Sequence, residues 1–276
     1  MEKKNDEKQN NYWNKVSKYR EYGIYHYNYV NLNFKEKYVT PADPNVHIYY
    51  VLSGSCNYEG INVKQGDILL FGINKIPVTS TMTKIELMVV TMDYELIYKV
   101  TGIRPAEYCE KAMLLREDNK FTRIIKSIDE SDLEQWVIKF EECMYELLSI
   151  KDELISNNFV HAIAAERRVR CQANAIVGHI SLQSGISTRQ LQRQFLDFFG
   201  ITLSEYAGIV RFTKAFQTMY MKDLITTAVE TGYYDQAHLS REFRNRAGNS
   251  PNQWKKDDMF HTFKEILSGL PDFQEE

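Results

Sequence analysis

The chain has 276 residues and a mass of 32.4 kDa, a length that is usual for two domains. Hydrophobic residues make up 43% and charged residues 26%, a balance that excludes a disordered or fibrous protein. No stretch approaches the roughly 18 apolar residues of a membrane span, and the polar start is unlike a secretory signal peptide, so we expect a cytoplasmic protein without membrane contact. The scattered cysteines predict neither a disulfide framework nor a zinc cluster: Cys56, Cys109, Cys143 and Cys171.

The net charge of −3 hides an uneven distribution along the chain. Residues 166–256 hold thirteen Lys and Arg against seven Asp and Glu, a net +6, whereas the remainder carries −9. An ordinary solvated surface with uneven charge would explain this. So would one part that meets a polyanion beside another part that does not.

The first third of the chain has the pattern of a small β-structure. Residues 1–20 are polar and without a period, and they are predicted to form a partly ordered tail. Short runs rich in Tyr, Val and Ile then alternate with turns up to about residue 93. Their number and spacing predict a small sandwich or barrel, with the clearest strands at His47–Leu52, Asp67–Phe71 and Ile85–Met92.

A helical pattern follows at residues 131–150, where Ser131 and Glu134 are spaced as a capping box. Its apolar residues recur in steps of three and four and form one stripe. The stripe either covers the β-domain or pairs with a second copy across a two-fold axis. We predict the second, a homodimer formed by Leu133, Trp136, Phe140, Met144 and Leu147.

The rest of the chain reads as helical and contains an internal repeat. Ser187–Tyr206 and Asp235–Trp254 align with a shift of 48 residues, and a glycine stands just ahead of each, Gly185 and Gly232. Each copy reads as a helix-turn-helix whose second helix is capped by Ser187 or Asp235. The helix at 204–221 would join the two units. The matched pairs are Leu191 with Leu239, Arg193 with Arg241, Phe195 with Phe243, Gly200 with Gly248 and Tyr206 with Trp254.

The second helix of such a unit enters the DNA major groove, where Arg pairs with guanine and Gln with adenine. With Leu191 and Phe195 facing the core, the opposite face of the first unit carries Arg and Gln side chains. The second unit repeats this arrangement. The residues predicted to point outward are Arg189, Gln192 and Arg193 in the first unit, and Gln236, Ser240 and Arg241 in the second.

The repeat resembles the AraC/XylS family of bacterial transcription regulators over about Ala173–Lys256. The family's second unit has a motif of some 25 positions, and this chain matches it with Ala228, Gly232, Tyr233, Asp235, Gln236, Ala237, His238, Leu239, Arg241, Phe243, Arg244, Gly248 and Pro251. Arg211 and Ala215 match the family's linking helix. This sequence departs from the family pattern at three positions. Leu239 stands where Phe is usual, Ala237 where Ser is usual, and Ser181 where Ala is usual.

The resemblance implies base contacts from Arg189, Gln192 and Arg193, and from Gln236, His238, Ser240 and Arg241. An outward Arg can also be a solvated charge, and His238 could pack locally. We expect Arg167, Arg168 and Arg170 to contact phosphates, which adds affinity without sequence choice.

The front of the chain resembles the cupin-like sensor barrel of many such regulators, on the runs His47–Gly54 and Gln65–Phe71. A small barrel can hold one small ligand, and tyrosines offer both apolar area and a hydroxyl. The candidate effector pocket is lined by Tyr25, Tyr27, Tyr49 and Tyr58, although strand core is the simpler interpretation for each. A catalytic cupin needs a His-x-His pair that this sequence lacks, so we expect no metal, no cofactor and no enzyme.

The predicted fold class is α+β, in five segments. A polar tail at 1–20 precedes a cupin-like sensor at 21–115, helices for dimerisation and linkage at 116–165, an all-α double helix-turn-helix domain at 166–265 and an acidic tail at 266–276. We predict a sequence-specific regulator of duplex DNA, an activator that contacts RNA polymerase and responds to a small molecule. The alternatives are a metal-dependent cupin enzyme with a vestigial helical domain and a sensor that acts through protein contacts only.

Overall fold

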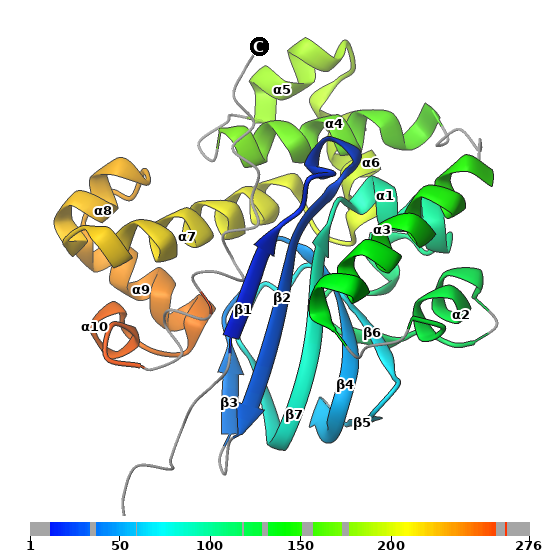
Figure 1. The fold of residues 1–276 in the computed structure, drawn as a ribbon. Coiled ribbons are helices and arrows are strands. Elements are labelled where there is room, and N and C mark those ends of the chain that lie inside the picture. The colour runs from blue at the N-terminus through cyan, green and yellow to red at the C-terminus, as the bar shows by residue number, and fades with distance from the viewer. Residues whose placement is uncertain are drawn as a thin grey trace, which may run out of the picture.

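The structure is a computed structural model and describes residues 12–33, 37–58, 60–117, 119–128, 132–150, 157–172, 177–257 and 263. It has a front part that combines a sheet with helices (residues 12–150) and a helical part (residues 157–257), as Figure 1 shows. The order predicted for the α+β fold, strands first and an all-helical part after them, is therefore confirmed.

The front part is built on one antiparallel sheet of eight strands. Along the sheet the order is β1-β2-β7-β4-β6-β8, while β3 pairs with β7 and β5 with β4. The two longest strands, β4 and β7, pair over most of their length and bend at register shifts. The strands are β1 (Tyr12–Val16), β2 (Ile24–Asn33), β3 (Lys37–Thr40), β4 (Val46–Tyr58), β5 (Ile61–Lys64), β6 (Ile68–Phe71), β7 (Val78–Met92) and β8 (Ala112–Leu114).

The sheet begins earlier than the sequence predicted. β1 lies at an edge, and its residues from Tyr12 to Val16 pair with β2. A short helical turn, η1 (Arg20–Tyr22), leads into β2. The tail predicted at 1–20 is therefore wrong from Tyr12 onward. An edge strand is held largely by main-chain hydrogen bonds. Its sequence therefore need not carry the strong hydrophobic pattern from which a strand is predicted.

Helix α3 (Leu133–Ile150) confirms the predicted helix, but its apolar stripe packs within the same chain. Trp136 stacks between Tyr50 and Phe140, with ring centroids 6.1 and 5.2 Å apart. Four of the five residues predicted to form the dimer are at most 2% exposed, namely Trp136, Phe140, Met144 and Leu147. The predicted dimer interface is therefore wrong, because the sheet already covers this stripe. Leu133 packs against the same core, and Ser131 lies outside the described residues, whereas Asp132 caps the helix through the Glu134 and Gln135 amides.

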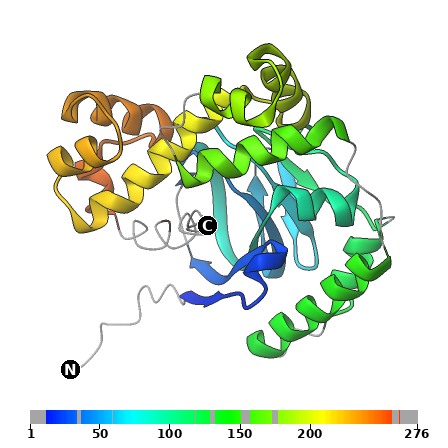
Figure 2. The ribbon, with the colours of Figure 1, turned by 90° about the horizontal axis from the view of Figure 1, so that it is seen from above.

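The helical part begins with α4 (Asn157–Cys171), which packs against the front part and against α5, α6 and α7 of its own part (Figures 1 and 2). Because α4 is one continuous helix, the boundary predicted at residue 166 falls inside it, and the two parts divide better before Asn157. The front part also contains α1 (Tyr94–Thr101), η2 (Pro105–Glu107) and α2 (Lys120–Lys126). The helical part consists of α4 (Asn157–Cys171), α5 (Val177–Ser184), α6 (Thr188–Phe199), α7 (Leu203–Met221), α8 (Leu224–Glu230), α9 (Gln236–Ala247) and α10 (Pro251–Trp254).

Candidate DNA interface

The first helix-turn-helix unit consists of α5 and α6. Gly185 makes the turn between them at φ 67°, a left-handed conformation that suits glycine. The Ser187 hydroxyl accepts a hydrogen bond from the Gln190 amide at 3.2 Å and so caps α6, as predicted. Ser181, where the family usually has Ala, is buried and its hydroxyl lies 2.9 Å from that of Thr188. The departure from the family pattern therefore adds a hydrogen bond between the two helices.

The second unit, α8 and α9, repeats this construction. Gly232 makes the turn at φ 76°, and the Asp235 carboxylate accepts a hydrogen bond from the His238 amide at 2.6 Å. Both second helices end on a left-handed glycine, Gly200 at φ 79° and Gly248 at φ 75°. The repeat found in the sequence is thus also a structural repeat, with equivalent turn glycines and helix caps in both units.

The inward faces of both units are anchored on the connecting helix α7. Leu191 and Phe195 of α6 and their counterparts Leu239 and Phe243 of α9 are all fully buried. The Phe243 ring lies 5.1 Å from Phe212 and 5.9 Å from Phe216, both on α7. Helix α7 therefore joins the two units through packed aromatic side chains rather than through a flexible linker.

Solvent reaches the outward faces of α6 and α9. Exposed residues there include the predicted base contacts Arg189, Gln192, Arg193, Gln236 and Arg241. Within the described part of the chain, none of these three arginines forms an ion pair, so their charge stays available to a polyanion. Ser240 and His238 are half-buried, and the His238 ring packs edge-on against Tyr233 at 5.2 Å.

The three arginines predicted to contact phosphates have different surroundings. Arg170 is 3% exposed, so the prediction of a phosphate contact is wrong for it. Arg167 is exposed, but its guanidinium donates to Glu95 at 2.7 Å and lies 3.4 Å from Asp93. Arg168 is half-buried, and no structural feature assigns it to DNA.

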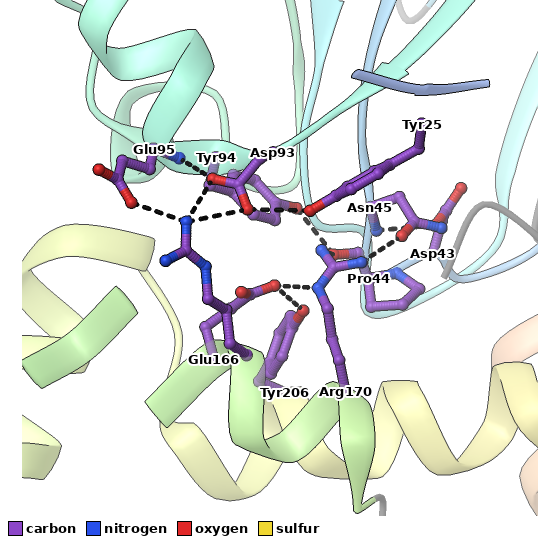
Figure 3. A network of polar contacts seen from close by, with 11 residues as sticks. Tyr25, Asp43, Pro44, Asn45, Asp93, Tyr94, Glu95, Glu166, Arg170 and Tyr206 are labelled. Atoms are coloured by element: carbon purple, nitrogen blue, oxygen red, sulfur yellow. Dashed lines mark hydrogen bonds and ion pairs between the residues drawn. The ribbon is translucent and has the colours of Figure 1, made fainter. Parts of the chain in front are cut away.

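Arg170 belongs to a polar network that joins α4 to the front part (Figure 3). Its guanidinium pairs with Glu166 on the same helix and donates to Asn45 Oδ1 at 2.6 Å and to the Pro44 carbonyl at 3.2 Å. Tyr206 of α7 donates to Glu166 at 2.6 Å. Burial works against the charge of the guanidinium, but Glu166 nearby raises the pKa of Arg170 well above its ordinary value. Sequence reasoning missed this network, since Arg170 lies more than 100 positions from its acceptors on Pro44 and Asn45.

The tyrosines of the predicted effector pocket divide into two pairs. Tyr49 and Tyr58 line a cavity enclosed by the sheet, whereas Tyr25 lines a separate and more open pocket of about 470 Å³ beside Asp93 and Arg167. The Tyr25 hydroxyl donates to Asp93 at 3.0 Å and that of Tyr27 to Glu141 at 3.2 Å. Burial and the neighbouring carboxylates raise the pKa of both hydroxyls. The cavity, called the sheet cavity below, is lined by Val30, Leu32, Thr40, Asp43, His47, Tyr49, Tyr58, Phe71, Gly72, Asn74, Leu87, Val89 and Phe263.

The polar wall of the sheet cavity is formed by residues that the sequence did not single out. The His47 ring lies 2.8 Å from Asp43 and 2.9 Å from the Thr91 hydroxyl, and all three residues are buried. Asp43 also pairs with Asn74 through two backbone hydrogen bonds of 3.0 and 2.9 Å. The wall thus holds donors and acceptors in fixed positions beside an otherwise apolar lining.

The described ranges bring no three His, Cys, Asp or Glu side chains together in an arrangement that would hold a metal ion. Every helix within them is too short or too polar to cross a bilayer.

Comparison with known proteins places the helix-turn-helix units in a family. Residues 180–257 match the model of the helix-turn-helix domain. The protein named "Probable transcription factor PqrA" from Proteus vulgaris is 32% identical over 80 residues, which are 28% of this chain and 66% of PqrA, just under two thirds of that relative.

Solved structures of ToxT from Vibrio cholerae share the fold of the whole chain. One, at 12% identity, has a TM-score of 0.53 and covers 83% of this chain and 97% of its own. Another, of wild-type ToxT with bound unsaturated fatty acid, has 13% identity and a TM-score of 0.50 and covers 98% of this chain and 100% of its own. These likenesses show that the front part and the double helix-turn-helix part together form a known two-part fold.

Proposed function

We propose that the chain is a transcription regulator of the AraC/XylS family, which binds a specific duplex DNA sequence with α6 and α9 and regulates transcription there. One observation carries the proposal. Two structurally repeated helices present exposed Arg and Gln side chains on the same type of outward face. Such side chains read base edges in the major groove, and one unit would read each half of the site.

The charge distribution supports the same proposal. The net +6 of residues 166–256 would attract the DNA backbone, while the acidic front part would stay off it. Exposed Arg167 is the one member of the predicted phosphate-contacting set that its position still favours, and binding would draw it away from Glu95. DNA binding also implies that the protein acts in the cytoplasm, where the bacterial chromosome lies.

We further propose that the regulator is an activator rather than an enzyme, that it contacts RNA polymerase, and that the front part senses a small molecule. ToxT, whose fold this chain shares, has been solved with an unsaturated fatty acid. In this chain the sheet cavity is the candidate site, because it combines an apolar lining with the polar wall of Asp43 and His47. Its volume is about 30 Å³, so the sheet and the loops around it must open before it can take more than a water-sized molecule. That the protein forms a homodimer stays a prediction, but the apolar face of α3 is not the surface through which it would do so.

Selection of sites from a random duplex library by the purified full-length chain tests the DNA proposal. We expect one motif with two half-sites, whose affinity falls steeply as salt rises. Arg123→Ala, which removes an exposed charge on α2 far from both units, is the matched control and should select the same motif. Recovery of no motif at low salt would show that the function is something else.

A further inference from the structure

The C-terminal ends of α6 and α9 both rest on the front part. Each helix ends on a glycine of the repeat, and each glycine faces residues of the front part. A Cβ atom added at Gly200 would lie 3.1 Å from the Ala106 Cα, and one added at Gly248 would lie 3.7 Å from the Pro77 Cγ. The C-terminal ends of α6 and α9, which are equivalent in the repeat, therefore contact the front part at two separate places.

Hydrogen bonds fix the second of these contacts. The Ala42 amide donates to the Arg246 carbonyl at 2.6 Å, in the last turn of α9. The Arg246 guanidinium in turn donates to the Lys75 carbonyl at 3.2 Å and to Glu242 at 2.7 Å. Arg246 thus connects α9 to two loops of the front part at once.

The first contact is made by packing and by one ion pair. Arg104, which precedes η2, lies 3.6 Å from Asp197 of α6. The Phe199 ring packs edge-on against Tyr94 of α1 at 5.3 Å. Both helices are therefore held by the front part as well as by α7.

We infer that the front part sets the distance and angle between the two recognition helices, and so determines which spacing of DNA half-sites the protein accepts. Inserting one base pair moves a half-site by about 3.4 Å and rotates it by roughly 35° about the DNA axis. A pair of helices held by the front part as well as by α7 cannot follow this change without deforming the DNA, which costs free energy. Arg246 and Ala106 are the positioning residues in this arrangement.

The contacts of Arg246 also connect the sheet cavity to the placement of α9, and so to the spacing of the DNA half-sites. Ala42 and Lys75, which hold Arg246, are the chain neighbours of Asp43 and Asn74. Asp43 and Asn74 pair with each other and line the sheet cavity. A molecule that binds the cavity more tightly in one arrangement of these loops would favour one placement of α9. This second step rests on the proposed function of the cavity, whereas the spacing itself needs DNA binding only.

The test measures binding of the full-length chain to duplexes that carry the selected half-sites at the preferred spacing and at one base pair fewer, one more and two more. The wild type should bind the altered spacings about tenfold more weakly or worse. Arg246→Ala should reduce this discrimination to about threefold or less while the base preference within each half-site stays unchanged. Arg244→Ala, which removes an exposed arginine on the same turn of α9, should keep the wild-type spacing profile.

A second variant changes the front part alone. Ala106→Phe adds bulk opposite Gly200 and should shift the preferred spacing without changing either half-site, and thermal melting of both variants confirms that they fold. The inference is wrong if the wild type binds all spacings alike, or if folded Arg246→Ala and Ala106→Phe keep the wild-type profile. A failure to select any base sequence would instead overturn the proposed function itself.

Discussion

The two helix-turn-helix units share one local design but differ in how they meet the front part. Aromatic side chains anchor the first unit, since Phe198 lies 5.6 Å from Tyr98 and Phe199 lies 5.3 Å from Tyr94, both on α1 of the front part. In the second unit the bonds to the front part gather at the end of α9. Helix α8 meanwhile exposes Ile225 and Val229 to solvent, at 66% and 72%.

The binding unit is therefore duplicated in this chain, but its mechanical role is not. The first unit is continuous with the core of the front part, so it serves as the fixed reference. The second is held by α7 and by a few polar bonds, which break at a lower cost than a packed aromatic core. Movement that changes DNA binding is therefore expected in the second unit.

The largest expected effect comes from removing one buried ring from each unit. Phe199→Ala and Phe243→Ala should each cost about 3–5 kcal/mol of the free energy of unfolding, because both rings are fully buried. Hydrogen exchange should separate them. Phe199→Ala should speed exchange in α1 of the front part as well as in α6, while Phe243→Ala should speed it only from α7 to α10. Identical exchange patterns would contradict the difference between the units.

Breaking the polar network on α4 should destabilise the protein by a similar amount. Arg170→Met leaves the buried Glu166 carboxylate without its partner and should cost about 3–5 kcal/mol in urea unfolding. Adding Glu166→Gln should recover much of this loss, because no unpaired charge remains. Arg167→Ala, at an exposed ion pair, is the matched control and should cost less than about 1 kcal/mol. A double variant no more stable than Arg170→Met would rule out the unpaired charge as the cause.

Base reading by the two units can be compared directly. Arg193→Ala and Arg241→Ala should each weaken binding to the preferred site by about 1–3 kcal/mol if the contact is bidentate. Each should relax base preference in a different half-site, as measured by repeating the site selection with each variant. A uniform loss on all DNA sequences would mean that these arginines contact phosphate.

The smallest effect concerns pH at the start of α7, the helix that carries both units. Hydrogen bonds from the Thr202 amide and hydroxyl lower the pKa of Glu205 below its ordinary 4.5. A carboxylate with a lowered pKa stabilises the fold above its unfolded pKa, and this stabilisation is lost as the pH falls through the folded value. Glu205→Gln keeps the capping geometry, so its urea midpoint should fall less between about pH 5 and pH 3 than that of the wild type. Parallel curves would contradict this.

The sequence predicted the features that depend on neighbouring residues. The turn glycines, the caps at Ser187 and Asp235 and the inward Leu and Phe all follow from spacings of a few residues, and the structure has each of them. The period of α3 also predicted a helix with one apolar face. It could not say what covers that face, because the same stripe suits a sheet or a second copy.

Contacts between distant segments were beyond the reach of such patterns. Arg170 is one of several arginines in a basic stretch, and nothing local marks it as the one that reaches Asn45, 125 positions away. Tyr25 and Tyr49 look alike in their strands, yet one hydroxyl bonds to Asp93 and the other residue lines the sheet cavity. Tertiary packing decides these roles, and a single sequence carries little signal for it.

Helix α4 has a consequence for anyone who wishes to work with the DNA-binding half alone. A fragment that starts at Glu166 would lack Phe159, which covers Phe198, and would lose Tyr94, which covers Phe199. It would also carry Arg170 without its acceptors on Pro44 and Asn45. Such a fragment would present fresh apolar surface to water and is expected to aggregate. The helical half of this regulator is therefore poorly suited to fusion with another sensor domain, unless that domain offers a complementary surface for α4 and α6.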